Sequence, residues 1–587
     1  MGWVAVWASI LAVATYVFYH KLIRNLGTSS SHYPPGPKPL PFIGNLRDLA
    51  GKELWLRAET WKRDYGRITY LHVFGLGVVF LNTPEAVLEL LDKRGAIYSD
   101  RPHLVMANEL CGCENMVAFT PYGKTSRRQR RLLQTALSPS SIRNYHPLLE
   151  LETKPFLRRL LEDPASYVEH IRRYAGGLTL LVVYGHQVKS NDDEFLRLAE
   201  DCVDVLANRI ASSGKIWPVD VFPSLKHIPL WFPGASFKRQ AVRWKAMMQE
   251  FVDRPYNHAL DEIRKGTART CFVSMLVDPD TYGAGALESG GHENNDTFKN
   301  DFRHVKEPKP KHSTTTQDHD LRWTANSIYS GRLSIAFLTL FILSMVKNPH
   351  VLARAQAEID SVTGGRRLPT FEDRVQLPYC NAVFTETLRW GVPVPLSLPH
   401  RLKEDDIYEG MLIPKGSLVF GNIWGIMRDE KIYPEPDMFK PERFLDLAHT
   451  SSTRVPDFAA QTSSSSPQSL STEKHHVESK DISAAERRRD PRTYVFGFGR
   501  RRCPGAHLVE SSLWLLMVSM IATLDMSKAN VPAAGEQRLD AGLRGAELAI
   551  EPEVVFDNSV FRIPRPFKCS IRPRSDHSLK ILMETLP

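Results

Sequence analysis

The sequence predicts a mainly α-helical protein with small β-sheets (α+β), preceded by a single transmembrane helix at its N-terminus. Three observations support this fold class. Helical hydrophobic patterns clearly outnumber the short apolar runs typical of strands. A long uncharged apolar run opens the chain. The 587 residues, 42% hydrophobic and 24% charged, are enough for a large multi-lobed core. The net charge of +9 is mild for this length and indicates no nucleic-acid partner by itself.

Residues 1–24 are expected to form a membrane anchor. The run Trp3–Tyr19 is apolar and uncharged, and with the residues that follow it reaches the roughly 20 residues of a membrane span. A cleaved signal peptide would carry basic residues before the run, whereas Lys21 and Arg24 follow it. The positive-inside rule then predicts a single-pass protein with a cytosolic domain. The Pro-rich residues 25–45 predict a stiff hinge.

A folded domain is expected over residues 46–575. Hydrophobic periodicity and turn residues predict these elements in order: a hairpin of Tyr70–Phe74 and Val78–Leu81, a helix from Pro84 to Leu91, helices over 194–265 interrupted between Trp217 and Pro233, an apolar helix over Trp323–Lys347, a helix over Ala353–Val362, mixed helix and strand over 377–425, and an apolar helix from Cys503 to about Leu524. The polar segments 283–316 and 447–489 are expected to be disordered insertions.

The cysteines indicate a reducing compartment. There are seven, at positions 111, 113, 202, 271, 380, 503 and 569, and their number is odd and their spacing irregular. This pattern is typical of free thiols and matches no zinc motif. At least one thiol is therefore available for a special role.

The segment from Phe496 to Gly505, F-G-F-G-R-R-R-C-P-G, carries the strongest chemical signal. Its glycines let the backbone turn tightly or approach a flat ligand. The three arginines before Cys503, and a helix expected to begin at Pro504, favour the thiolate by lowering the pKa of the thiol. Arginines also pair well with carboxylates. A lone cysteine in a basic loop is usually structural, but the whole string favours a thiolate ligand.

This string resembles the haem-binding loop of the cytochrome P450 family, F-x-x-G-x-R-x-C-x-G. Phe496, Gly499, Arg501, Cys503 and Gly505 occupy every fixed position. The resemblance implies the cytochrome P450 fold and haem b with Cys503 as the axial thiolate ligand of the iron. It also implies that the other four residues bind the cofactor. A thiolate on haem iron favours cleavage of the O–O bond.

Two further segments match the family in the correct order. Glu386 and Arg389 lie on one face of a predicted helix at i, i+3. Alone, such a pair is usually a solvated surface bridge. The resemblance implies instead a buried pair, joined by Arg443 from the segment Pro441–Phe444, that holds the scaffold on the haem side.

Contacts to the haem propionates are expected from three basic residues. His400 and Arg401 follow the Glu386 helix where the family often places a basic residue, although an exposed basic turn is the alternative for each. Arg130 takes the arginine position of a stretch that resembles the family's W-x-x-x-R helix. Ser126 stands where that motif has its tryptophan.

The oxygen-activating helix departs from the family pattern A/G-G-x-D/E-T-T. No carboxylate lies between Trp323 and Lys347, so the usual proton-relaying acid is missing and the catalytic residues stay unassigned. Ser334 and Thr339 are candidates for the hydroxyl alone. Two explanations remain open: an impaired or unusual oxygenase, or a misplaced splice boundary in the gene model. The polar insertions resemble translated intron sequence, which favours the misplaced splice boundary.

The resemblance implies a haem-dependent monooxygenase that inserts one oxygen atom from dioxygen into a lipophilic substrate, in fungal secondary metabolism. Electrons would come from NADPH–cytochrome P450 reductase, with cytochrome b5 as a second candidate donor, at the endoplasmic reticulum membrane. The apolar segment from Val219 to Gly234 resembles the substrate entrance of fungal microsomal members. Two rivals remain: a haem-thiolate protein that does not activate dioxygen, such as an isomerase, a dehydratase or an inactive paralogue, and a non-enzymatic membrane-tethered binding protein.

Overall fold

The computed structural model describes most of the folded part of the chain, namely residues 32–51, 53–210, 217–278, 315–329, 332–446, 485–532, 547–558 and 560–583. The expected anchor at 1–24 and most of the polar insertions at 283–316 and 447–489 lie outside the described residues. The segment from His32 onward contributes to the fold, because His32 forms an isolated bridge with Met411.

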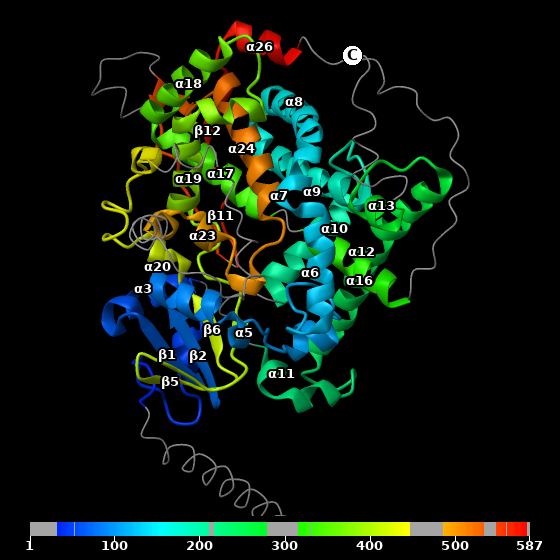
Figure 1. Cartoon of the computed structure of the whole chain (residues 1–587), viewed down its shortest axis with the longest axis vertical. Coiled ribbons are helices and arrows are strands. Elements are labelled where there is room, and N and C mark those ends of the chain that lie inside the picture. The colour runs from blue at the N-terminus through cyan, green and yellow to red at the C-terminus, as the bar shows by residue number, and fades with distance from the viewer. Residues whose placement is uncertain are drawn as a thin grey trace, which may run out of the picture.

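Helices make up most of the molecule and occupy the upper and right-hand parts of Figure 1. The longer ones are α3 (Leu54–Tyr65), α6 (Lys124–Leu137), α8 (His146–Glu162), α9 (Tyr167–Tyr184), α10 (Glu194–Val205), α12 (Ser236–Lys265), α16 (Thr315–Ile328), α17 (Arg332–Lys347), α18 (Pro349–Thr363), α19 (Pro378–Gly391) and α24 (Ala506–Thr523). Shorter α-helices include α2 (Leu46–Leu49), α4 (Pro84–Val87), α5 (Gly95–Tyr98), α7 (Pro139–Ile142), α11 (Pro218–Val221), α13 (Phe272–Val277), α20 (Ile423–Met427), α23 (Arg492–Val495) and α26 (Asp576–Met583). The helix predicted from Pro84 is present and continues as a π-helical turn, η1 (Leu88–Lys93).

The largest sheet has the order β1 (Ile68–Val73), β2 (Leu76–Leu81), β6 (Leu418–Gly421), β3 (His400–Arg401) and lies at the lower left of Figure 1. The predicted hairpin is confirmed, because β1 and β2 pair antiparallel around Gly75, whose φ of +88° suits glycine in the turn. β2 pairs parallel with β6, which joins segments far apart in the sequence.

The remaining sheets have two strands each. They are β4 (Asp406–Tyr408) with β5 (Met411–Ile413), β7 (Leu524–Lys528) with β12 (Cys569–Pro573), β8 (Asn530–Pro532) with β9 (Glu547–Ala549), and β10 (Phe556–Asn558) with β11 (Arg562–Pro564). The architecture is therefore mainly helical with small sheets, as the sequence predicts.

The prediction of one apolar helix over Trp323–Lys347 is wrong in one respect. α16 ends at Ile328, Tyr329 lies outside helix, and α17 begins at Arg332. Because a cation at a helix N-terminus opposes the helix dipole, the start of α17 needs a counter-charge. Asp204 of α10 provides it, with its carboxylate 2.6 Å from Nη2 of Arg332.

The core is centred on α17 and α24. Both are apolar around most of their circumference and are buried among other helices. Two segments, Thr316–Lys347 and α24, are long and apolar enough to span a membrane. In their most apolar windows, however, 81% of the residues of Thr316–Lys347 and 72% of those of α24 are buried. This burial is typical of core helices, and it explains why α17 carries charged side chains only at its ends, Arg332 and Lys347, and why α24 carries only Glu510.

Candidate functional site: a cysteine loop beside a cluster of buried cations

The loop that carries Cys503 lies between α23 and α24 and is tightly folded. The main-chain N–H of Cys503 donates to the carbonyl of Phe496 at 2.7 Å. Gly499 has a φ of +48°, and a Cβ there would lie 2.2 Å from the carbonyl oxygen of Leu91. A Cβ at Gly505 would meet no heavy atom within 4 Å. Packing of the chain thus requires glycine at 499, whereas at 505 the glycine leaves open space beside the thiol.

Two sequence predictions for this loop are wrong. α24 begins at Ala506 with Gly505 as its N-cap residue, so Pro504 is not the first helical residue. The pKa of the Cys503 thiol is raised, because burial outweighs the Gly505 N–H and the charges of Arg130 and Arg502, which lower it. A thiol that becomes a metal ligand is nevertheless deprotonated by the metal itself.

The side chains of Arg500 and Arg501 explain why the thiol gains so little from its basic neighbours. Arg500 points outward and donates to the hydroxyl of Tyr122 at 2.6 Å. Arg501 is buried and donates to the carbonyls of Ser99 and Thr120 at 2.7 and 2.8 Å. Arg500 and Arg501 are therefore close to Cys503 in sequence, but their charged groups are directed to other partners.

Four basic residues from separate parts of the chain gather beside this loop: Arg101, from the segment after α5, Arg130 of α6, His400 of β3 and Arg501. Arg101 and Arg501 are 7% exposed and His400 is 2% exposed. Burial and the charges of Arg501 and Arg130 lower the pKa of Arg101 to about 9. Burial and Arg130 likewise lower the pKa of Arg501 to about 10. Arg130 also couples electrostatically to Cys503.

The three arginines of this cluster donate hydrogen bonds only to main-chain carbonyls within the described residues. The acceptors are Leu398 and Pro399 for Arg101, Arg502 for Arg130, and Ser99, Val117 and Thr120 for Arg501. Nε of Arg101 is buried without a partner. Burial and the neighbouring arginines lower the pKa of His400 to about 3, while Nδ1 of its ring lies 2.8 Å from the Tyr98 carbonyl.

This donor set fits a dianionic group with two carboxylates. Buried positive charges are costly without sufficient counter-charge. Asp100 attracts Arg101 and Arg501, but it forms no ion pair with either among the described residues. A pair of carboxylates would supply further negative charge and could satisfy Nε of Arg101. Such a group would oppose the part of the His400 pKa shift that comes from the neighbouring arginines, although burial is the larger cause of that shift. The thiol of Cys503 and the open space at Gly505 complete the site. Its chemistry suits haem, because the thiol can ligate the iron and the basic cluster can bind the two propionates.

Arg401 and Ser126 do not join the cluster. Arg401 follows His400 on β3 but is exposed, because neighbouring residues of a strand point to opposite faces. It lines the cavity described below, which Arg101 of the cluster also reaches. The hydroxyl of Ser126 lies 3.3 Å from the main-chain N–H of Gly123, at the start of its own helix. Sequence reasoning missed Arg101, since no pattern around it distinguishes a buried arginine from an exposed one.

Glu386, Arg389 and Arg443 form one group of ion pairs. Nε and Nη2 of Arg389 donate to the two carboxylate oxygens of Glu386 at 2.7 and 2.8 Å, and both side chains are fully buried. Nε of Arg443 lies 3.3 Å from Glu386, and the N–H of Lys440 donates to the same carboxylate at 2.8 Å. Nη1 of Arg389 donates to the carbonyls of Met427 and Pro436. Every charge in this group is thus paired.

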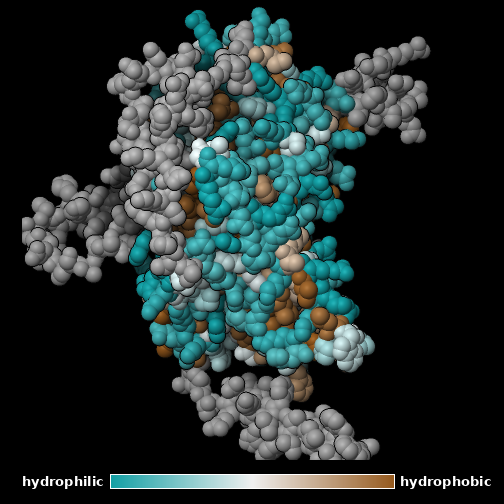
Figure 2. All heavy atoms as spheres, turned by 90° about the vertical axis from the view of Figure 1, so that its right-hand side faces the viewer, coloured by the Kyte–Doolittle hydropathy of each residue, from teal (hydrophilic) through white to brown (hydrophobic). Residues whose placement is uncertain are grey.

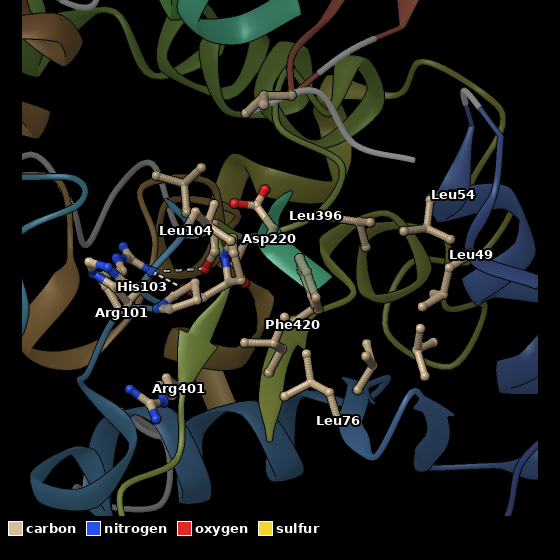
Figure 3. A pocket seen from close by; sticks show the side chains of 18 of the residues that line it. Leu49, Leu54, Leu76, Arg101, His103, Leu104, Asp220, Leu396, Arg401 and Phe420 are labelled. Atoms are coloured by element: carbon tan, nitrogen blue, oxygen red, sulfur yellow. Dashed lines mark hydrogen bonds between the residues drawn. The ribbon is translucent and has the colours of Figure 1, made fainter. Parts of the chain in front are cut away.

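A cavity of about 560 Å³ opens at the lower end of the molecule, between the β1–β2 hairpin, the segment from Arg101 to Leu104, and α11. Figure 3 shows Leu49, Leu54, Leu396 and Phe420 on its apolar wall, with Arg101, His103 and Arg401 toward the opposite end. Burial raises the pKa of Asp220 to about 6, although the N–H groups of Met106 and Val105 oppose the shift. A cavity of this size and lining suits a small apolar molecule.

The candidates for the oxygen side lie on α17. Thr339 is fully buried, and its hydroxyl donates to the carbonyl of Ile335 at 2.7 Å, one turn earlier in the same helix. Ser334 is 9% exposed. The nearest carboxylates earlier in the chain, Asp318 and Asp320, precede Trp323 and are bonded to Tyr256 and Arg128 respectively. The described residues therefore place no free acid on this helix.

Comparison with known proteins identifies the class. The structure is that of a mainly helical protein with a cysteine loop beside a cluster of buried basic residues. The model of the family described as Cytochrome P450 matches residues 34–534. Cytochrome P450 monooxygenase claT of Ampulloclitocybe clavipes is 33% identical over 99% of this chain and 98% of its own. Tryptamine 4-monooxygenase of Psilocybe cyanescens is 32% identical over 97% of this chain and 98% of its own.

The chain belongs to the cytochrome P450 family. A second protein of Ampulloclitocybe clavipes, cytochrome P450 monooxygenase claR, is 34% identical over 97% of this chain and 91% of its own. The family implies a haem-thiolate cofactor and a redox partner, and the relatives' names make the chain an oxidoreductase of the monooxygenase type.

Proposed function

We propose that the protein is a haem-dependent monooxygenase that inserts one oxygen atom from dioxygen into a lipophilic substrate, in fungal secondary metabolism. The observation that carries the proposal is the thiol of Cys503 beside the buried cluster of Arg101, Arg130, His400 and Arg501. That cluster lacks carboxylate partners within the described part of the chain, which suits the two propionates of haem b.

Each residue has a distinct role in this proposal. Cys503 ligates the iron, and the basic cluster binds the propionates. Gly499 lets the loop pack against the Leu91 carbonyl, and Gly505 leaves open space beside the thiol. Phe496 holds the loop through its carbonyl. Bound haem supplies dioxygen activation with electron donation from the thiolate. Exclusion of water follows from the buried faces of α17 and α24.

A lipophilic substrate is favoured by the lower end of the molecule. Phe222, Leu230, Trp231 and Phe232 are all exposed, and Trp231 reaches 80% exposure. Figure 2 shows apolar side chains gathered at this end, which also holds the cavity. Exposed apolar clusters of this kind mark membrane or ligand contacts. The proposed location is the endoplasmic reticulum membrane, with a single N-terminal span and a cytosolic catalytic domain.

The proposed electron donor is NADPH–cytochrome P450 reductase, with cytochrome b5 as a second candidate. Arg501 is buried and cannot contact such a partner. Lys124, Arg127 and Arg131 of α6 are exposed, as is Arg500. These residues form a basic face beside the cysteine loop that suits an acidic protein surface.

A second candidate function follows from the oxygen side: a haem-thiolate protein that does not activate dioxygen, such as an isomerase, a dehydratase or an inactive paralogue. The supporting observation is the lack of a carboxylate from Trp323 to Lys347, where the helix is also divided. A misplaced splice boundary is the competing explanation. Sequencing the transcript across codons 325–345 separates them, since an unchanged reading eliminates the splice explanation.

Turnover with isotopic oxygen tests the main proposal. The full chain in membranes, supplied with reductase, NADPH and labelled dioxygen, is expected to give products that carry one labelled oxygen atom. NADPH consumption that depends on substrate but leaves no label in any product would favour the second candidate. Retention of haem with conversion of a substrate in the absence of NADPH would establish the isomerase or dehydratase alternative.

A further inference from the structure

A network of buried charges joins the two ends of the cysteine loop. Arg492, on α23 before the loop, and Glu510, on α24 after it, lie 3.3 Å apart between Nη1 and Oε1. Arg492 is 8% exposed as a residue, and the side chain of Glu510 is 17% exposed. Arg492 also donates through Nε to both carboxylate oxygens of Asp490, at 2.9 and 3.0 Å.

A third element extends this network to the surface. Nη2 of Arg374, on the 3-10 helix η7 (Phe371–Gln376), donates to the same oxygen of Glu510 at 2.8 Å. Its guanidinium also lies 5.1 Å from the ring centre of Trp514. Although burial opposes ionisation, the two arginines lower the pKa of Glu510 to about 2. Glu510 is therefore ionised at all ordinary pH values.

The network reaches the neighbour of Cys503 through one more contact. Nη2 of Arg502 donates to the main-chain carbonyl of Arg492 at 2.8 Å. The carbonyl of Arg502 in turn accepts from Nη2 of Arg130 at 2.8 Å. The residue before Cys503 is thus fixed at its side chain by the charged network and at its carbonyl by the basic cluster.

We propose that Glu510 is a positioning residue that holds the Cys503 thiolate at its distance from the haem iron. Glu510 touches neither the thiol nor the cofactor site. It acts by fixing Arg492, whose carbonyl holds Arg502, and by locking α23 to α24 on both sides of the loop. Groups that orient the ligands of a metal affect affinity roughly 10–100-fold when they are replaced. The inference rests on the proposed function in taking Cys503 as the iron ligand.

Replacement of Glu510 by glutamine tests the proposal, because it keeps the shape and removes the charge that orders two arginines. The matched control is D373N. Asp373 is a buried carboxylate on η7, paired with Arg367 through two hydrogen bonds, and it makes no contact with the cysteine loop. R374Q is a milder second variant, since it removes only the outer partner of Glu510.

The readouts are the carbon monoxide spectrum of the reduced full-length protein and the rate of haem loss, both measured below the temperature at which circular dichroism detects unfolding. E510Q is expected to lose haem about tenfold faster than wild type and to convert part of the thiolate-type Soret band to the shorter-wavelength form. R374Q should show a smaller change in the same direction, and D373N a wild-type spectrum.

Each other outcome has a definite meaning. A wild-type spectrum and wild-type haem retention for E510Q, or an equal change in D373N, would overturn the positioning role. If E510Q fails to fold, the spectrum of R374Q decides in its place, and an unchanged spectrum then counts against the proposal. Lack of a thiolate-type band in the wild-type protein would instead defeat the proposed function, which keeps the two failures distinct.

Discussion

The two sides of the proposed haem site differ in how their charges are arranged. On the thiolate side, Glu386, Arg389 and Glu510 form buried ion pairs with complete sets of partners. On the oxygen side, α17 is apolar, and no carboxylate lies between Trp323 and Lys347. The difference teaches that the ion pairs around the cysteine loop form without any contribution from acids on α17.

Two acids, Glu510 beside the cysteine loop and Asp220 beside the cavity, contrast in their pKa values. Arginines lower the pKa of Glu510 to about 2, although burial opposes them, so its ionised form stabilises the fold. Burial raises the pKa of Asp220, beside the cavity, to about 6, so its ionised form opposes folding. Replacement of Glu510 should therefore disturb the fold and the cofactor, whereas replacement of Asp220 should stabilise the fold.

The largest effect is expected from breaking the buried pair. E386Q leaves the fully buried guanidinium of Arg389 without a counter-charge, and loss of one partner of a buried pair costs about 3–5 kcal/mol. Chemical denaturation should detect this loss. E250Q is the control, because Glu250 pairs with Arg254 at the surface, with the two side chains 47% and 40% exposed, and should cost less than about 1 kcal/mol. Equal losses would contradict the account.

The next effect concerns the basic cluster. R101Q removes a buried cation whose Nε has no partner among the described residues, whereas R401Q removes an exposed one. A hydrogen bond to a charged group is worth about 1.5–3 kcal/mol, so R101Q should accelerate haem loss by roughly 10- to 150-fold. Transfer of haem to a scavenging apoprotein measures the rate. Wild-type haem retention in R101Q, or a larger effect of R401Q, would remove Arg101 from the site.

A smaller effect, of opposite sign, is expected at Asp220. Its pKa is raised in the folded state, so the unfolded state binds fewer protons near neutral pH and folding is favoured as pH falls through about 6. His103 opposes the shift, and the thiol of Cys111 is the other titratable neighbour. D220N should stabilise the protein by roughly 1–2 kcal/mol at pH 7.5 and by little at pH 4.5. Thermal melts at the two pH values test this, and destabilisation at pH 7.5 would refute it.

The smallest effect is expected from the hydroxyls of α17. The hydroxyl of Thr339 is already bonded within its helix, and neither Thr339 nor Ser334 has an acid as a partner. General acid catalysis contributes about 10²–10⁴-fold where it operates, so T339A and S334A should each change turnover by less than about threefold. Both should keep the wild-type carbon monoxide spectrum. A loss of turnover in either variant would identify the oxygen-side hydroxyl and weaken the contrast between the two sides.

The sequence predicts the thiolate side well because its signals are contiguous motifs with strict chemical requirements. The close approach of Leu91 requires glycine at 499, and Glu386 and Arg389 sit one helical turn apart. The hairpin and the helix after Cys503 follow from local hydrophobic patterns in the same way.

The features that the sequence does not reveal depend on tertiary packing. Arg101 is buried by chain segments about 300 residues away, those of Leu398 and Pro399. The raised pKa of the Cys503 thiol follows from burial, which local charges do not offset. The division between α16 and α17 involves Arg332 and its partner Asp204 on another helix. Each of these depends on which distant segments meet, and local patterns carry no such information.

The carbon monoxide spectrum of the reduced full-length protein, for wild type and for C503S, tests the central claim most directly. The account predicts a thiolate-type Soret band in the wild type and its loss in C503S, with the fold retained by circular dichroism. The same band in both proteins would exclude Cys503 as the ligand. A wild type that binds no haem at all would contradict the account and favour a membrane-tethered binding protein.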